Sequence, residues 1–394
     1  MKRIPTLSLA ALLFVAGATS PLLADPYADR MEAFEKESGE PSRMTLYARA
    51  SAMPLPPFDE ATNRTVVIAL ANPFTQDLSF LKTYAAEYDP AAKLFYDATA
   101  IKTYKHFTYS APTDPAPNLQ ALQQVGRYLV LRSQANAKGG AMNTAIDDAA
   151  AVWIAGYSFE TTNDSIPGNL LGTSLRVLAL DQMSALLEMQ SLTVEQQTRI
   201  IALVTKQPDP ISSQVDIILA DINSWPEMLK SQNTSTPEKL KEASDKLAAA
   251  VKPLAGLDYR KQRDRFADLE KAREDAESVI GKNRAMPIGD LLTRTAVADA
   301  KQAVLLTGLC VSIANNQNTT GKATDEEIGQ LAAPIKSFLI DPFTGDPPRI
   351  NNGGNGKFLV ISAGPDGVFQ QGEMKVYSSR FGLSSGGDIY LQRK

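Results

Sequence analysis

The chain has 394 residues, of which 44% are hydrophobic, and its 44 Asp and Glu side chains outnumber its 40 Lys and Arg side chains. The formal net charge of −4 disfavours nucleic acid as a partner, because its phosphates repel an acidic surface. This length predicts two or three domains. The single cysteine, Cys310, excludes an internal disulfide, and its apolar neighbours predict a buried, unreactive thiol.

Residues 1–24 have the pattern of a cleavable secretory signal peptide. Lys2 and Arg3 precede an apolar run that is shorter than the ~20 residues of a transmembrane helix, and Ala24 is a small residue at a cleavage position. We therefore expect a mature chain that starts at Asp25 and works in the periplasm or cell envelope, or is secreted. No later segment is expected to span a membrane.

The first half of the mature chain predicts helices that begin and end at recognisable residues. Residues 25–58 are interpreted as an N-terminal arm that ends in a proline-rich linker. From Leu78 onwards apolar residues recur at helical spacing, and Pro90 is expected to start the next element. Asn118 is predicted to cap a helical hairpin that turns at Gly139 and Gly140.

The second half continues this pattern and then changes. Capping boxes are predicted at Thr193 and Thr324, and Pro237 is placed at a first helical position. Residues 59–285 are therefore predicted to be a helical domain without strands between Asn118 and Gly281. Residues 286–394 are predicted to form a long apolar helix followed by a β module.

The β module is indicated by composition, since Gly, Asn, Pro and Asp are frequent from residue 341 to residue 388. Two β-like runs, Phe358–Ile361 and Asp388–Leu391, lie within it, and the glycine-rich residues 351–356 are interpreted as a hairpin turn. The predicted fold is mainly α: antiparallel helical hairpins with tetratricopeptide-like packing but no regular repeat, and a small C-terminal antiparallel β module.

Several segments resemble a family of exported bacterial helical proteins that has no assigned activity. In the body the resemblance rests on Pro117–Leu122 (PNLQAL), Leu129–Arg132 (LVLR) and Leu192–Gln197 (LTVEQQ). In the tail it rests on Asp341–Pro347 (DPFTGDP), Gly356–Gly367 (GKFLVISAGPDG) and Gly386–Tyr390 (GGDIY). The tail is also similar to the globular head of type II secretion major pseudopilins, which implies a small sheet packed on a long helix and often a calcium ion.

The rest of the chain departs from the pseudopilin pattern. Residues 1–24 contain no Glu, and the mature start at Asp25 is polar, whereas a pseudopilin keeps an apolar N-terminal helix with a glutamate. The resemblance to pseudopilins therefore implies the head alone.

Few residues are candidates for catalysis. His106 is the only histidine, and with one cysteine the chain lacks the ligands of a His and Cys zinc site. Carboxylate pairs that could perform acid–base chemistry are Asp147 with Asp148, Asp216 with Asp221, and Glu270 with Glu274, although such acids on charged helices are usually solvated. Trp153 and Trp225 are expected in the core, with a peptide groove walled by Trp153 as the alternative.

The tail carries the one predicted metal site. Asp366 follows the first β-like run and Asp388 begins the second, so antiparallel pairing of the two would bring both carboxylates to the same end of the sheet. Backbone carbonyls of residues 362–388 can complete the shell, and such oxygens in a Gly-rich loop suit calcium. The alternative is that Asp366 forms a turn and Asp388 caps a strand.

These observations favour an exported helical scaffold that binds an unknown protein partner and carries a calcium-stabilised tail. No other cofactor, no catalytic residue and no nucleic acid is predicted. The alternatives are a carboxylate-dependent periplasmic hydrolase and an accessory component of a secretion or pilus system.

Overall fold

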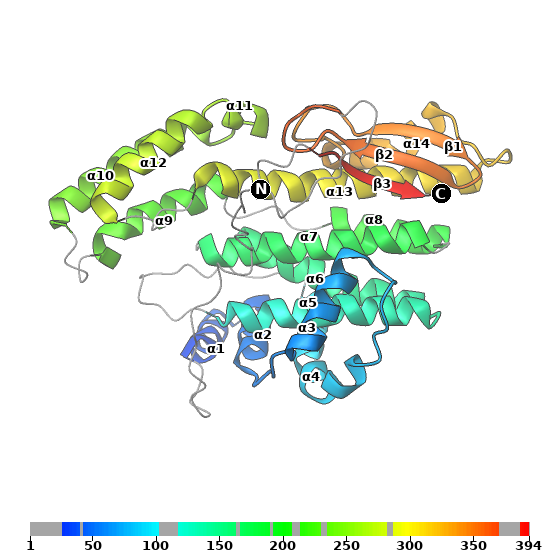
Figure 1. The fold of residues 1–394 in the computed structure, drawn as a ribbon, viewed down its shortest axis with the longest axis horizontal. Coiled ribbons are helices and arrows are strands. Elements are labelled where there is room, and N and C mark those ends of the chain that lie inside the picture. The colour runs from blue at the N-terminus through cyan, green and yellow to red at the C-terminus, as the bar shows by residue number, and fades with distance from the viewer. Residues whose placement is uncertain are drawn as a thin grey trace, which may run out of the picture.

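The computed structural model describes residues 26–39, 42–101, 117–162, 166–189, 192–206, 213–229, 235–281, 287–369 and 387–393. This part of the chain forms fourteen α-helices and one three-stranded antiparallel sheet near the C-terminus (Figure 1). The predicted fold class, mainly helical with a small C-terminal sheet, is therefore confirmed. Between Asn118 and Gly281 the described residues contain no strand.

The first four helices are α1 (Pro26–Ser38), α2 (Arg43–Ala52), α3 (Glu60–Ala71) and α4 (Leu81–Ala100). The segment interpreted as an arm supplies α1 and α2, whose Tyr27 and Tyr47 side chains are fully buried in the larger core. The prediction that Pro90 starts a new element is wrong, because α4 continues through it. Proline removes one backbone hydrogen bond from the helix, and the burial of Tyr88 and Phe95 on either side of Pro90 offsets the free-energy cost of that loss.

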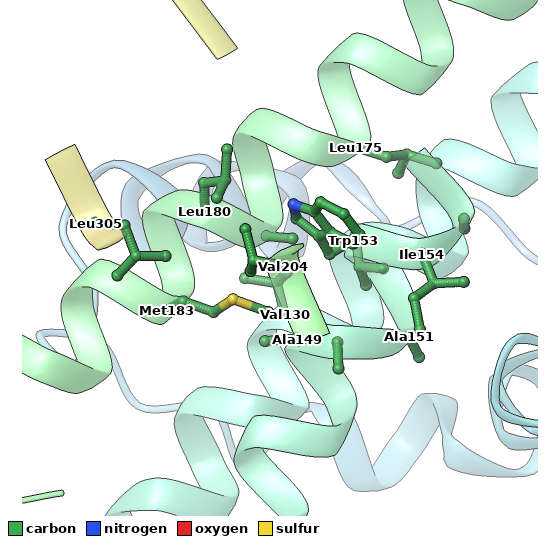
Figure 2. Close-up of a cluster of buried hydrophobic side chains, with 14 of the residues drawn as sticks. Val130, Ala149, Ala151, Trp153, Ile154, Leu175, Leu180, Met183, Val204 and Leu305 are labelled. Carbon is green, nitrogen blue, oxygen red and sulfur yellow. The ribbon is translucent and has the colours of Figure 1, made fainter. Parts of the chain in front are cut away.

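The centre of the larger core consists of α5 (Leu119–Lys138), α6 (Met142–Thr162) and α7 (Ile166–Met189). The predicted hairpin is confirmed, since Asn118 accepts a hydrogen bond from the backbone of Ala121 and α5 ends before Gly139. Figure 2 shows Trp153 of α6 among buried side chains of α7 and α8, which include Leu175, Leu180 and Val204. Trp153 is therefore a core residue, and the groove walled by Trp153 is excluded.

A second, smaller core lies at one end of the molecule. It is formed by α9 (Gln214–Leu229), α10 (Pro237–Val251) and α12 (Phe266–Ile280), which follow α8 (Val194–Thr205). A short helix, α11 (Tyr259–Arg263), links α10 and α12. The long helix α13 (Ile288–Gln317) contributes its first turns to this core and its remainder to the larger one. It runs between α7 on one side and α12 and the sheet on the other (Figure 1).

The C-terminal module packs on α13. After α14 (Asp325–Ala332) and a 3₁₀ helix (Ala333–Phe338), the strands β1 (Arg349–Gly354), β2 (Lys357–Ser362) and β3 (Ile389–Arg393) lie in the order β1-β2-β3. Gly308 of α13 allows close approach of the sheet, because a Cβ there would lie 2.8 Å from Leu391. The predicted runs match β2 and β3, whereas β1 occupies residues that were partly interpreted as a turn.

Two helices are long and apolar enough to cross a membrane by composition, α7 and α13. In their most apolar windows, 67% of α7 and 83% of α13 is buried inside the protein. Both are therefore accounted for as core helices, and the described residues contain no clear membrane span.

Candidate functional site

The predicted metal residues lie beside the paired ends of β2 and β3. Ser362 is paired with Ile389 in an antiparallel register, so Asp388 immediately precedes the last pair. Gly364 lies against the backbone of Gly387, since a Cβ at Gly364 would be 2.2 Å from the Gly387 oxygen. Asp388 is buried, whereas Asp366 is half-buried. The two segments that carry these carboxylates are therefore in contact.

The same end of the sheet holds a buried carboxylate that the sequence analysis did not single out. Asp341 is fully buried and accepts hydrogen bonds from the backbone N–H groups of Phe343 at 2.9 Å and Ala363 at 3.2 Å. Burial raises the pKa of the Asp341 carboxyl. Asp366 accepts a hydrogen bond from the backbone of Val368, which is the geometry of a turn.

Among the described residues no group of three or more His, Cys, Asp and Glu side chains has the geometry to hold a metal ion. A calcium site made of two carboxylates and several backbone carbonyls is a different arrangement, and its carbonyls were predicted between residues 362 and 388. Residues 370–386 of that range lie outside the described part of the chain. The calcium site stays a prediction.

A separate feature is a cleft of about 690 Å³ where the two cores and the C-terminal module meet. It is lined by the start of α9, by residues 256–262 around α11, by one face of α13 from Leu292 to Gln302, and by residues 337–342 that lead into the β module. Most of its lining is apolar, and Phe338 and Ile340 expose 38% and 40% of their surface there.

The charged side chains that line the cleft, within the described residues, are Asp258 and Asp299. Asp258 caps α11 by accepting from the backbone of Lys261, and its other carboxylate oxygen lies 3.0 Å from the Lys261 ammonium group. The hydrogen bonds to Lys261 lower the pKa of Asp258. Asp299 accepts from the Nη2 group of Arg176 at 2.9 Å.

Arg176 connects the cleft to the interior of the helical body. Its Nη1 group donates to Glu160 at 2.7 Å, and both side chains are buried between α6 and α7. Burial raises the pKa of the Glu160 carboxyl, and the Arg176 guanidinium opposes that rise. Gly156 and Gly172, each one helical turn before one member of this pair, bring the two helices into backbone contact.

Two arginines of the α11 segment fix the cleft to the C-terminal module. Arg260 donates to the carbonyl of Thr344 at 2.8 Å, and Arg263 donates to the carbonyl of Pro365 at 3.3 Å. Tyr259 packs edge-to-face on Phe343, with ring centroids 5.2 Å apart. The second core is therefore held against the loop that carries Asp366.

The predicted carboxylate pairs do not converge. Asp147 forms an ion pair with Arg199, whereas its neighbour Asp148 is buried with Arg132 at 2.8 Å. Asp216 accepts from Ser213 at the start of α9, and Asp221 accepts from Trp225 Nε1 one turn later. Glu270 pairs with Arg273, and Glu274 is exposed. These carboxylates do not line the cleft.

Cys310 and His106 are the remaining candidates from the sequence. Cys310 is fully buried, and burial raises the pKa of its thiol to about 11, so the predicted unreactive thiol is confirmed. His106 lies outside the described residues.

The cleft residues were missed because they come from four segments that are far apart in the chain. The only local signal was the polar interruption of an otherwise apolar helix at Thr295, Asp299 and Gln302, which share one face. The chain matches no protein-family model, no curated protein and no solved structure.

Proposed function

We propose that this protein is an exported, non-enzymatic binding scaffold, in which the helical body and the C-terminal module hold a partner protein in the cleft between them. The observation that carries the proposal is the cleft itself, about 690 Å³ in volume and mainly apolar. Ligand sites are commonly concavities of about 300–1,000 Å³ with apolar walls and a few polar groups. The cleft has that size and that chemistry.

The distribution of carboxylates supports binding over hydrolysis. A general acid needs a carboxyl whose pKa is raised and which reaches the substrate. In the described part of the chain, burial raises the pKa of five carboxyls outside the cleft: Asp148, Glu160, Asp221, Asp290 and Asp341. The two carboxylates in the cleft are each paired with a basic side chain.

A photocrosslinking experiment in living cells tests the binding function. We would place a benzophenone amino acid at Phe338 on the cleft and, as a control, at Val67, an exposed apolar residue of α3. We expect a discrete adduct in the envelope fraction from position 338 and none from position 67. Equal labelling at positions 338 and 67 would refute the cleft as a binding site. The absence of an adduct both from position 338 and from the same amino acid placed at Ile340, also on the cleft, would refute it as well.

Export is part of the proposal, and it has its own test. N-terminal sequencing of the mature protein from the periplasmic fraction should start at Asp25 or within a few residues of it. Recovery of an intact Met1 in the membrane fraction would contradict cleavage.

We also propose that calcium stiffens the tail through Asp366 and Asp388. The contact between Gly364 and Gly387 supports this, because it joins the two segments that carry the carboxylates. The affinity expected of two carboxylates is that of extracellular modules, about 0.1–1 mM. Millimolar calcium should raise the unfolding temperature relative to chelator in the wild type and in Asp346→Asn, an exposed control in the same module, but not in Asp388→Asn. A wild type that does not respond would end the idea.

A further inference from the structure

One carboxylate, Asp299, presents negative charge on the α13 side of the cleft. Arg176 contacts two acids, Glu160 and Asp299, so the trio of one guanidinium and two carboxylates has a net charge of −1. Glu160 is buried, and a buried carboxylate requires a full counter-charge. The single Arg176 charge is shared by two carboxylates, and Asp299, which is 50% exposed, therefore presents the excess negative charge to the cleft.

The basic side chains of the α11 segment lie near the cleft, but the contacts that the structure shows for them are with groups other than Asp299. Lys261 and Arg260 lie 3.0 Å and 3.8 Å from Asp258, and Arg260 and Arg263 donate to backbone carbonyls of the C-terminal module. Within the described residues no Lys or Arg lines the cleft. On the α13 side of the cleft, a ligand therefore meets the carboxylate of Asp299 without a Lys or Arg in the described part of the lining beside it.

Hydrogen-bonding groups lie beside Asp299 on the same face of α13. Gln302 accepts from Arg176 through its Oε1 atom at 3.1 Å, and its amide nitrogen makes no hydrogen bond with the described residues. The second carboxylate oxygen of Asp299 is likewise not engaged by a described residue. One acceptor and one donor are therefore free to meet the groups of a polypeptide.

The dimensions of this face set the length of the occupant. Gln302 follows Leu292 by ten residues of helix, a rise of about 15 Å, and an extended chain covers that length in about four to five residues. Phe338 and Ile340 supply exposed apolar surface within the same cleft.

We propose, on the basis of the binding function above, that the cleft takes an extended segment of a partner protein, about four or five residues long. One Lys or Arg side chain of that segment pairs with Asp299. The apolar residues of the segment that flank this Lys or Arg pack against Leu292, Phe338 and the rest of the apolar lining.

The probe is a fluorescein-labelled peptide of sequence Val-Leu-Lys-Leu-Val, with two matched peptides that carry norleucine or Glu in place of Lys. Binding to the full-length exported protein is measured by fluorescence anisotropy. We expect the Lys peptide to bind about two- to fivefold more tightly than the norleucine peptide, because Asp299 is half exposed and water screens the pair. The Glu peptide should bind most weakly, and about 0.5 M salt should reduce the differences.

Two variants assign the effect to Asp299. Asp299→Asn keeps an acceptor for Arg176 and removes the charge, and it should make the Lys and norleucine peptides equal. The control is Asp181→Asn, because Asp181 is 45% exposed and also forms an ion pair between α7 and α13, with Lys301, but does not line the cleft. This control should preserve the preference for Lys. Urea unfolding of both variants verifies that each is folded.

The outcomes separate this inference from the proposed function. Equal binding of all three peptides to the wild type, or a preference for Lys that survives Asp299→Asn, overturns the role of Asp299 but leaves a binding scaffold. No binding of any peptide overturns the peptide segment as the occupant, while crosslinking at Phe338 still decides whether the cleft binds a partner. Cleavage of the peptides by the protein refutes the non-enzymatic function itself.

Discussion

The glycine pair at the crossing of α6 and α7 gives the sharpest test of the fold that supports the cleft. A Cβ at Gly172 would lie 2.4 Å from the backbone nitrogen of Glu160 and 2.7 Å from the carbonyl oxygen of Gly156. Both obstacles are backbone atoms, so no side-chain rotation relieves the clash. Real Cβ contacts are ordinary from 3.4 Å, and Gly172→Ala therefore requires the helices to separate locally by about 1 Å.

The cost of that separation has two parts. Overpacking a well-packed core costs about 1–3 kcal/mol, and the better helix propensity of alanine returns about 1 kcal/mol. The larger part is the ion pair one turn away, because moving the helices apart by about 1 Å stretches the 2.7 Å bond between Arg176 and Glu160 beyond hydrogen-bonding distance. Breaking a buried pair costs about 3–5 kcal/mol, so partial loss leads us to expect a net destabilisation of about 3 kcal/mol.

Urea unfolding followed by far-ultraviolet circular dichroism measures this free energy. The matched control is Gly329→Ala in α14, where a Cβ meets no atom within 4 Å and the substitution should stabilise the helix by up to about 1 kcal/mol. A Gly172→Ala protein as stable as the Gly329→Ala protein would refute the close crossing of α6 and α7.

Two further predictions concern buried polar groups. The Thr307 hydroxyl of α13 is buried and has no hydrogen-bond partner among the described residues, so Thr307→Val should stabilise the protein by about 1 kcal/mol in urea unfolding. Thr293→Val should instead destabilise the protein by about 1–3 kcal/mol, because the Tyr259 hydroxyl, 2.7 Å from the Thr293 hydroxyl, would lose its partner. The changes in the free energy of unfolding of the two variants must have opposite signs for this reasoning to hold. Burial raises the pKa of Asp221, whose carboxylate accepts from Trp225 Nε1 at 3.1 Å. The folded state thus binds this proton more tightly than the unfolded chain, and stability falls as pH rises from the unfolded pKa, about 3.9, through the raised folded value. Asp221→Asn should be more stable than the wild type at pH 7 and equal to it in acid below the unfolded pKa, and a constant difference at all pH values would contradict the shift.

The sequence by itself determined several helix ends. Asn118, Thr193 and Thr324 cap helices as predicted, because a capping side chain bonds to a backbone N–H within three residues. The hairpin turn after α5 was equally local. Such signals involve neighbouring residues only, and they do not depend on the rest of the fold.

The errors arose where tertiary packing outweighs local preference. Pro90 sits inside α4 because burial on both sides of it holds the helix together. Strand β1 contains Asn and Gly residues with low strand propensity and is mostly exposed, so it forms through its pairing with β2 and not through an alternating pattern of its own.

The cleft was decided by the tertiary structure alone. Its lining comes from four segments between residues 213 and 342, and the pair of Arg176 with Asp299 joins residues 123 positions apart. Arg176 carries no local signal, and the polar interruption of α13 at Asp299 is equally compatible with a solvated surface. The charge of the cleft depends on Glu160 being buried beside Arg176, and that burial follows from the backbone contact of two glycines on different helices. Only the packing of the helices brings these groups together, because the energy that selects their arrangement lies in contacts between segments and not within any one of them.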